Sequence, residues 1–434
     1  MQGPAAYEEL ALRVRSDGLG GYVTQVVRSP YGCPDVQFDP EGLVSESASM
    51  LWASMSSSAF RRDIGTPNQG SGKPEKPQVV GDRLFRALFR EELLQNFLLS
   101  VGRIEGRQDL GLRIRLIFSP SDPGTRRLLS LPWELLYRAD TRDFIARNPL
   151  TPLVRYLEVP RLTSPVTLTS RLRILAVTAN PCGTQPLALE EECAGIQAAI
   201  GGNPGIDIEF LPNPTIPRLR SAIQDSEFHA LHFMGHGGFD STTGEGFLVF
   251  ADSRGLTSPV PGRVLGEVLK GGPSVRSVFL NACRTAQTTG AQSQDLFSGV
   301  AAALVLAGLP AVIAMQAPVS DSAAIGFSRR FYETLALGFP VDAAVAESRL
   351  AIYLGAPDSF EWAIPALFLS VPDGRIFVAA TPDREEASSP QSMPPRDPSP
   401  ASDQSTTGGQ GSFNIGGSGH QISGGIHFNG GQKQ

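Results

Sequence analysis

The chain has 434 residues, of which 41% are hydrophobic and 18% are charged, and its formal net charge is −6. This composition is that of an ordinary globular protein, and at ~150 residues per domain the length predicts two or three units. An acidic chain without a basic stripe argues against nucleic-acid binding.

Cysteine usage and apolar runs indicate where the chain resides. Its four cysteines show no CxxC spacing, which predicts reduced thiols and a cytoplasmic location. The N-terminal residues lack the basic and apolar regions of a signal peptide. The longest apolar run, 300–315, is interrupted by Gly308 and Pro310 and is shorter than the roughly 20 residues of a bilayer span. We therefore expect no membrane segment.

The first part of the chain predicts a small β-rich region over residues 1–64. Alternating residues over 7–15 and 22–27, with Asp17 and Gly18 between them, indicate a hairpin. Residues 65–77 are rich in Gly, Pro and Ser and predict a linker. Helical spacing follows over 79–99. The alternation over 112–118 then predicts a strand with one wet face, and another strand follows at 153–159.

From residue 170 onward the pattern alternates between apolar runs and helical segments, which is typical of a parallel sheet covered by helices. The fold class expected is therefore α/β, with a mostly parallel sheet. The predicted strands are 172–177, 206–211, 228–234, 275–280, 311–315, 360–369 and 376–378, the last two closing the sheet. The predicted helices are 189–200, 216–224, 296–307, 322–337 and 342–354.

The C-terminal residues differ in character from the rest of the chain. Residues 381–410 are rich in Pro, Ser, Asp and Gln and predict a disordered linker. Residues 411–434 are Gly-rich, and 412–429 carry no Asp, Glu, Lys or Arg but contain spaced Ile, Phe, Asn and Gln. Such a segment can stack identically between chains or remain a flexible terminus. It resembles the RHIM-like amyloid signalling motifs of bacterial death-type proteins.

Two apolar runs each lead to one reactive side chain. His236 lies between Gly235 and Gly237 after the run 228–234, and Cys283 follows the run 275–280. A strand that ends in a polar residue places it at the carboxyl edge of the sheet, where open α/β folds form their sites. The histidine precedes the cysteine by roughly 50 residues, as in caspases, and the Asn281–Thr285 run matches the caspase signature at Ala, Cys and Arg.

These residues resemble the CHAT family of caspase-like cysteine peptidases. The resemblance rests on 232–237 (HFMGHG) and 280–285 (LNACRT), and extends to 131–137 (LPWELLY), 152–156 (PLVRY), 299–308 (GVAAALVLAG) and 318–321 (PVSD). It implies a non-catalytic first part at 78–165 and a caspase-like catalytic domain at 166–380. It also implies a cysteine endopeptidase acting on protein substrates, in a bacterial defence or regulated cell-death pathway.

In that chemistry Cys283 is the nucleophile and His236 the general base and acid, because a cysteine attacks as its thiolate. Gly237 and Gly238 allow a tight turn, and their N–H groups, together with that of Cys283, could hold an oxyanion. His229 and His232 are expected to be core histidines. A zinc site of His232, His236 and Cys283 lacks the Glu of a helical HExxH and a further ligand, so neither metal nor cofactor is expected.

The substrate pocket has several acidic candidates. Asp321, Asp295 and Asp252 could read a basic side chain before the cut bond, as many caspase-clan enzymes do. Asn281 stands two positions before the cysteine, where those enzymes carry an Asp, and this departs from a simple basic preference. Asp321 could instead cap the helix 322–337.

Two other functions stay open at this point. The chain could be a catalytically inactive caspase-like scaffold, recruited to an upstream sensor or to copies of itself through residues 412–429. The intact His236 and Cys283 pair argues against this alternative. A nucleotide-binding α/β protein is less favoured, because no GxGxxG or GxxxxGK[ST] follows a strand.

Overall fold

The computed structural model describes residues 4, 6–17, 21–32, 35–38, 75–120, 122, 125–159, 163–187, 189–240, 242–284 and 295–379. All of them belong to one compact unit, Met1–Ala380. The predicted linker 381–410 and the segment 411–434 lie outside the described residues, as does most of the predicted linker 65–77. The domain boundaries predicted from the sequence stay predictions.

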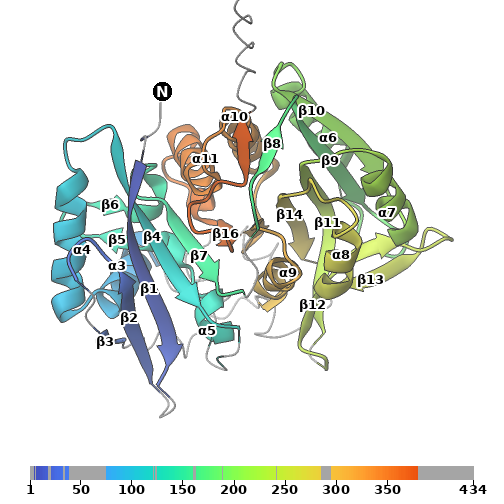
Figure 1. Cartoon of the computed structure of the whole chain (residues 1–434). Helices are drawn as coiled ribbons and strands as arrows, with labels where there is room; N and C mark the ends of the chain where they lie inside the picture. Colours follow the sequence, from blue (N-terminus) through green and yellow to red (C-terminus); the bar gives the residue numbers. More distant parts are fainter. Residues whose placement is uncertain are drawn as a thin grey trace, which may run out of the picture. The chain divides into compact units, whose positions relative to one another are not determined.

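A 13-stranded sheet runs through the described part of the unit, in the order β10-β9-β11-β14-β15-β16-β7-β4-β1-β2-β3 (Figure 1). A side branch, β12 and β13, pairs with β11. The strands are β1 (Ala6–Ser16), β2 (Tyr22–Arg28), β3 (Asp35–Phe38), β4 (Leu110–Phe118), β7 (Leu153–Leu157), β9 (Leu172–Ala179), β10 (Ile206–Pro212), β11 (Ala230–Asp240), β12 (Glu245–Ala251), β13 (Thr257–Pro261), β14 (Ser277–Arg284), β15 (Ala311–Met315) and β16 (Pro365–Leu369).

The sheet contains two parallel runs of opposite direction. The strands β10, β9, β11, β14 and β15 are parallel, and so are β16, β7, β4 and β1. The runs meet at the antiparallel pair β15–β16. The mostly parallel α/β sheet expected from the sequence is confirmed, and so is the hairpin of β1 and β2.

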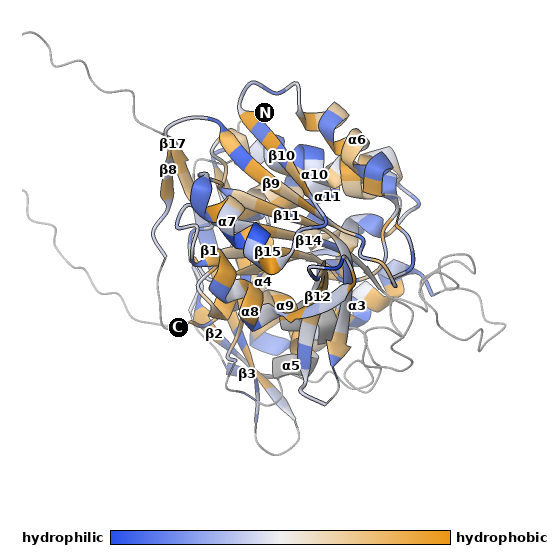
Figure 2. Cartoon of the chain, turned by 90° about the vertical axis from the view of Figure 1, so that its right-hand side faces the viewer, coloured by the Kyte–Doolittle hydropathy of each residue, from blue (hydrophilic) through white to orange (hydrophobic). Residues whose placement is uncertain are grey.

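Helices cover both faces of the first run. Figure 2 shows α6 and α10 on one side of β9, β11 and β14, and α7, α8 and α9 on the other. The helices approach each other closely. A Cβ on Gly266 of α8 would lie 2.4 Å from the Ala307 Cβ, and one on Gly195 of α6 would lie 2.4 Å from the Cδ1 of Ile325 on α10, so a larger residue at either position requires a neighbour to shift. The helices are α3 (Pro77–Leu88), α4 (Glu91–Ile104), α5 (Thr125–Ser130), α6 (Leu189–Ile200), α7 (Ile216–Asp225), α8 (Gly262–Leu269), α9 (Asp295–Leu306), α10 (Asp321–Ala336) and α11 (Val341–Gly355).

Two predicted elements differ from the structure, and one small sheet was not predicted. The helix expected over 79–99 is two helices, α3 and α4, separated at Phe89 and Arg90, and Glu91 begins α4 with a φ of 49°. The segment 376–378 does not close the main sheet, because β17 (Phe377–Ala379) pairs only with β8 (Val166–Leu168) among the described strands. A further two-stranded sheet joins β5 (Tyr137–Arg138) to β6 (Asp143–Phe144).

The wet face expected for residues 112–118 is also wrong, because every residue of β4 is buried. Arg113 pairs with Asp342 on α11 and stacks over the Tyr7 ring at 4.8 Å. Arg115 pairs with Glu9 of β1 at 2.5 Å and stacks over Tyr156. The alternation in sequence is real, but its charged positions are covered by partners that lie far along the chain.

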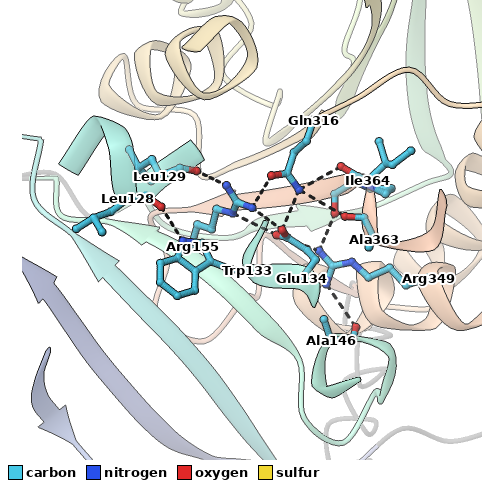
Figure 3. A network of polar contacts seen from close by, with 11 residues as sticks. Leu128, Leu129, Trp133, Glu134, Ala146, Arg155, Gln316, Arg349, Ala363 and Ile364 are labelled. Carbon is cyan, nitrogen blue, oxygen red and sulfur yellow. Dashed lines mark hydrogen bonds and ion pairs between the residues drawn. The ribbon is translucent and has the colours of Figure 1, made fainter. Parts of the chain in front are cut away.

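A buried polar network joins the two parallel runs (Figure 3). Glu134, which is 1% exposed, accepts hydrogen bonds from Arg155 of β7 and from Gln316, the residue that follows β15. Arg155 also donates to the Gln316 side chain at 2.7 Å. Arg349 of α11 lies 3.6 Å from Glu134 and donates to the Pro365 carbonyl at 2.7 Å. The network therefore fixes the start of the loop that leads from β15 to α10.

Candidate active site

The two predicted catalytic residues lie on adjacent strands. β11 and β14 pair in parallel, and His236 and Cys283 are opposite each other in the register. Both strands run further than the sequence predicted, so each residue lies inside a strand rather than after it. The backbone of Cys283 is described, but its side chain lies outside the described part of the chain.

His236 is 1% exposed, and a backbone carbonyl fixes its orientation. Its Nε2 lies 2.7 Å from the carbonyl oxygen of Gln185. A carbonyl can only accept, so Nε2 carries the proton and Nδ1 keeps the lone pair of the neutral ring. Nδ1 is buried and has no hydrogen-bond partner among the described residues. Burial lowers the pKa of His236, and the bond to Gln185 opposes this shift. The lowered pKa favours the neutral ring that a general base needs.

Gly237 and Gly238 do not form the tight turn that the sequence predicted. Both lie within β11, and neither has a positive φ. The strand continues because the antiparallel β12 pairs with β11 from Gly237 onward, on the edge where the pairing with β9 ends at Gly235, and there Gly238 is opposite Phe247. A Cβ on Gly238 would lie 2.3 Å from the Phe247 ring, so close packing requires glycine here. The role of their N–H groups at an oxyanion stays a prediction.

A buried carboxyl lies beside the strand of the cysteine. Glu192, on the first turn of α6, accepts a hydrogen bond from the Asn281 side chain, and both are less than a tenth exposed. Burial raises the pKa of Glu192 to about 7, the Asn281 bond opposes the shift, and the charge of Asp321 adds to it. Strongly raised carboxyl pKa values are concentrated at functional sites.

The three acidic residues predicted to line a substrate pocket lie in different environments. Asp321 is the exposed first residue of α10, and the helix is capped by Ser320, whose hydroxyl accepts from the Ala323 N–H at 3.4 Å. The capping alternative for Asp321 is therefore wrong. Asp252 accepts from the N–H groups of Arg254 and Leu256 at 2.8 and 2.9 Å, which occupies it within its own turn. Asp295 begins α9, and its side chain lies outside the described residues.

The other two histidines of the β11 region pack in the interior. His232 is fully buried between Tyr332 and Phe279, and its Nδ1 lies 3.3 Å from the Tyr332 hydroxyl. This burial lowers the pKa of His232 to about 3. His229 accepts from the Arg173 N–H at 2.9 Å. Within the described residues, no group of three or more His, Cys, Asp or Glu side chains is arranged to hold a metal ion.

The sequence profile of the CHAT domain matches residues 78–377. The chain belongs to the CHAT domain family. The matched region contains His236 and Cys283, which are opposite each other on β11 and β14 and are called the register pair below. It also contains the buried network around Glu134 and the Glu192–Asn281 pair. No curated protein sequence matches significantly.

Among solved structures, the CHAT chain is similar to the Arg-specific cysteine proteinase gingipain R, with 12% identity and a TM-score of 0.38 over 73% of this chain and 74% of that chain. It is also similar to the complex of the pro- and mature domains of Porphyromonas gingivalis RgpB, with 12% identity and a TM-score of 0.40 over 73% and 76%. A third match is Saccharomyces cerevisiae separase in complex with securin, with 17% identity and a TM-score of 0.37, over 66% of this chain and 17% of that chain.

Sequence motifs of the CHAT domain gain a structural explanation. In LPWELLY and PLVRY the charged residues Glu134 and Arg155 are the centre of the buried network. Sequence reasoning missed two contacts near the candidate site. The Gln185 carbonyl, in the loop between β9 and α6, accepts from His236, and the Glu192 carboxyl, on the first turn of α6, accepts from Asn281. The only signal in the sequence was the run of three glutamates at 190–192, of which the structure buries the last.

No helix among the described residues is long and apolar enough to cross a membrane.

Proposed function

We propose that the chain is a cysteine endopeptidase in which Cys283 attacks the substrate and His236 moves the proton. The observation that carries the proposal is the His236–Cys283 register pair on adjacent parallel strands. The Gln185 carbonyl supports it, because it holds the tautomer whose Nδ1 is a free base. The pathway proposed is bacterial defence or regulated cell death.

The proposed reaction has two halves. The Cys283 thiol gives its proton to His236, and the thiolate forms a C–S bond with the scissile carbonyl carbon. The resulting oxyanion is stabilised by backbone N–H groups, for which Gly237 and Gly238 are the candidates. When the C–N bond breaks, His236 returns the proton to the leaving amine. Water activated by His236 then hydrolyses the acyl-enzyme and restores the thiol.

We also propose that Asp321 reads a basic side chain before the cut bond. It is exposed at the start of α10, and its charge acts on Glu192, so both belong to one acidic environment.

We propose further that residues 412–429 couple the enzyme to an upstream sensor or to copies of itself. Their uncharged sequence with β-forming and amide side chains supports this.

An electrophilic peptide probe directed at thiols tests the proposed nucleophile. Cys182 is exposed, whereas burial raises the pKa of the half-buried Cys193 to about 11. Of these two described thiols, Cys182 is the expected source of background labelling, and Cys33 lies outside the described residues. Labelling is therefore compared in Cys182→Ser, alone and combined with Cys283→Ala or His236→Ala. The proposal expects mass-mapped labelling at Cys283 that both second substitutions abolish. Equal labelling with and without His236 contradicts a dyad and favours the inactive scaffold.

A further inference from the structure

Glu192 differs from the two glutamates that precede it on the first turn of α6. Glu190 and Glu191 are exposed, whereas Glu192 is 8% exposed. Burial of a carboxyl group is costly unless a partner compensates for the lost hydration. A buried carboxyl therefore needs a structural or functional explanation.

The partner of Glu192 belongs to the strand of the proposed nucleophile. The Asn281 side-chain N–H donates to the Glu192 carboxylate across the contact between α6 and β14. Asn281 is 7% exposed and lies two positions before Cys283, and residues two apart on a strand share a face of the sheet. The bond therefore fixes the part of β14 that carries Cys283.

The loop that leads into α6 contacts the strand of the proposed base. Gln185 lies in the loop between β9 and α6, and its carbonyl oxygen accepts from His236 on β11. The loop is braced internally, because the Asn180 side chain donates to the Leu187 carbonyl at 3.3 Å and the Thr184 hydroxyl donates to the Pro181 carbonyl at 2.8 Å. Residues 185–192 thus touch both strands of the register pair.

The electrostatic environment of Glu192 makes this contact sensitive to its ionisation. Asn281 on β14 and Asp321 on α10 are the groups among the described residues that act on the Glu192 charge. The first stabilises the carboxylate and the second destabilises it. A carboxylate can only accept from the Asn281 amide, whereas a protonated carboxyl can also donate to it. The bond between α6 and β14 therefore changes character near neutral pH.

We propose that Glu192 is a positioning residue that acts through Asn281, fixing the end of β14 that carries Cys283 while Gln185 of the same connection fixes His236. This inference rests on the proposed peptidase function. It assigns to the β9–α6 connection the relative placement of nucleophile and base. Glu192 itself touches neither the substrate nor the reacting atoms.

The test compares full-length Glu192→Ala, Glu192→Gln, Asn281→Ala and the double alanine variant, with Glu190→Ala as the exposed control on the same turn. Two rates are measured from pH 5 to pH 9: peptide cleavage, with kcat and KM separated, and site-resolved alkylation of Cys283 by iodoacetamide. Loss of a buried hydrogen bond to a charged group lowers kcat by roughly tenfold to a hundredfold. KM stays nearly unchanged, and the double variant is no slower than the slower single variant. Glu192→Gln keeps an acceptor for Asn281, so it retains activity at pH 6 but shifts the pH at which kcat is half-maximal.

Three results overturn the inference: a kcat of Glu192→Ala equal to that of Glu190→Ala, additive effects with Asn281→Ala, or an altered preference for the side chain before the cut bond with kcat unchanged. The last result makes Glu192 a specificity carboxyl. If Glu192→Ala does not fold, as judged by thermal unfolding, the pH profile of Glu192→Gln decides. A wild-type chain that cleaves no peptide contradicts the proposed function instead. The inference is then tested by Cys283 alkylation alone, which Glu192→Ala must alter and Glu190→Ala must not.

Discussion

Replacing Glu192 by glutamine should stabilise the protein in a way that depends on pH. Burial, with the charge of Asp321, raises the pKa of this carboxyl from 4.5 to about 7, against the Asn281 bond. A raised carboxyl pKa means that folding favours the protonated form. The contribution of Glu192 to stability is therefore fully present below pH 4.5 and is lost as the pH rises through about 7. At 1.36 kcal/mol per pKa unit, the full loss is about 3 kcal/mol.

The amide of Glu192→Gln has the shape of the protonated carboxyl and does not ionise. Urea unfolding of wild type and variant, measured across pH, gives the difference in the free energy of unfolding. We expect the variant to be more stable by less than about 1 kcal/mol at pH 5 and by about 3 kcal/mol at pH 8.5. Glu190→Gln, on the exposed side of the same turn, is the matched control. A difference between Glu192→Gln and wild type that does not vary with pH refutes the burial argument.

Three further predictions concern other parts of the chain. Glu134→Gln leaves Arg155 and Arg349 buried without a counter-charge and should lower the free energy of unfolding by roughly 3–5 kcal/mol; a loss below about 1 kcal/mol, as for an exposed pair, contradicts the role of the network. Asp321→Asn should lower kcat/KM for peptides with Arg or Lys before the cut bond by about tenfold, the effect of a partly covered charge pair; an unchanged preference across a peptide library removes Asp321 from the pocket. A peptide of residues 410–434 should form fibres with the ~4.7 Å cross-β spacing, weakened by Ile422→Pro; a peptide that stays monomeric at high concentration leaves the segment without an assembly mechanism.

Much of the fold follows from hydrophobic periodicity. The helix expected at 189–200 and the strand expected at 311–315 have those bounds in the structure, because continuous apolar runs and helical spacing are local signals. A dyad requires the strands of His236 and Cys283 to be adjacent, and the register shows that they are.

The differences arise where distant contacts override the local pattern. Helical spacing continues across the break at Arg90, so one helix was expected where two form. Arg113 alternates like a solvent-facing residue but is buried against Asp342, 229 positions away. The Gln185 carbonyl could not be predicted at all, because every residue has a carbonyl and only the folded loop brings this one to His236. Burial of Glu192 rather than of its neighbours depends on the contact with Asn281.

Peptide cleavage by the wild type, Cys283→Ala, His236→Ala and the double variant tests the central claim most directly. A dyad predicts that each single substitution lowers kcat by at least ~10³-fold and that the double variant loses little more, because the two residues act as one unit. Thermal unfolding of each variant shows that the fold is retained. Cleavage that persists in either folded single variant contradicts the account.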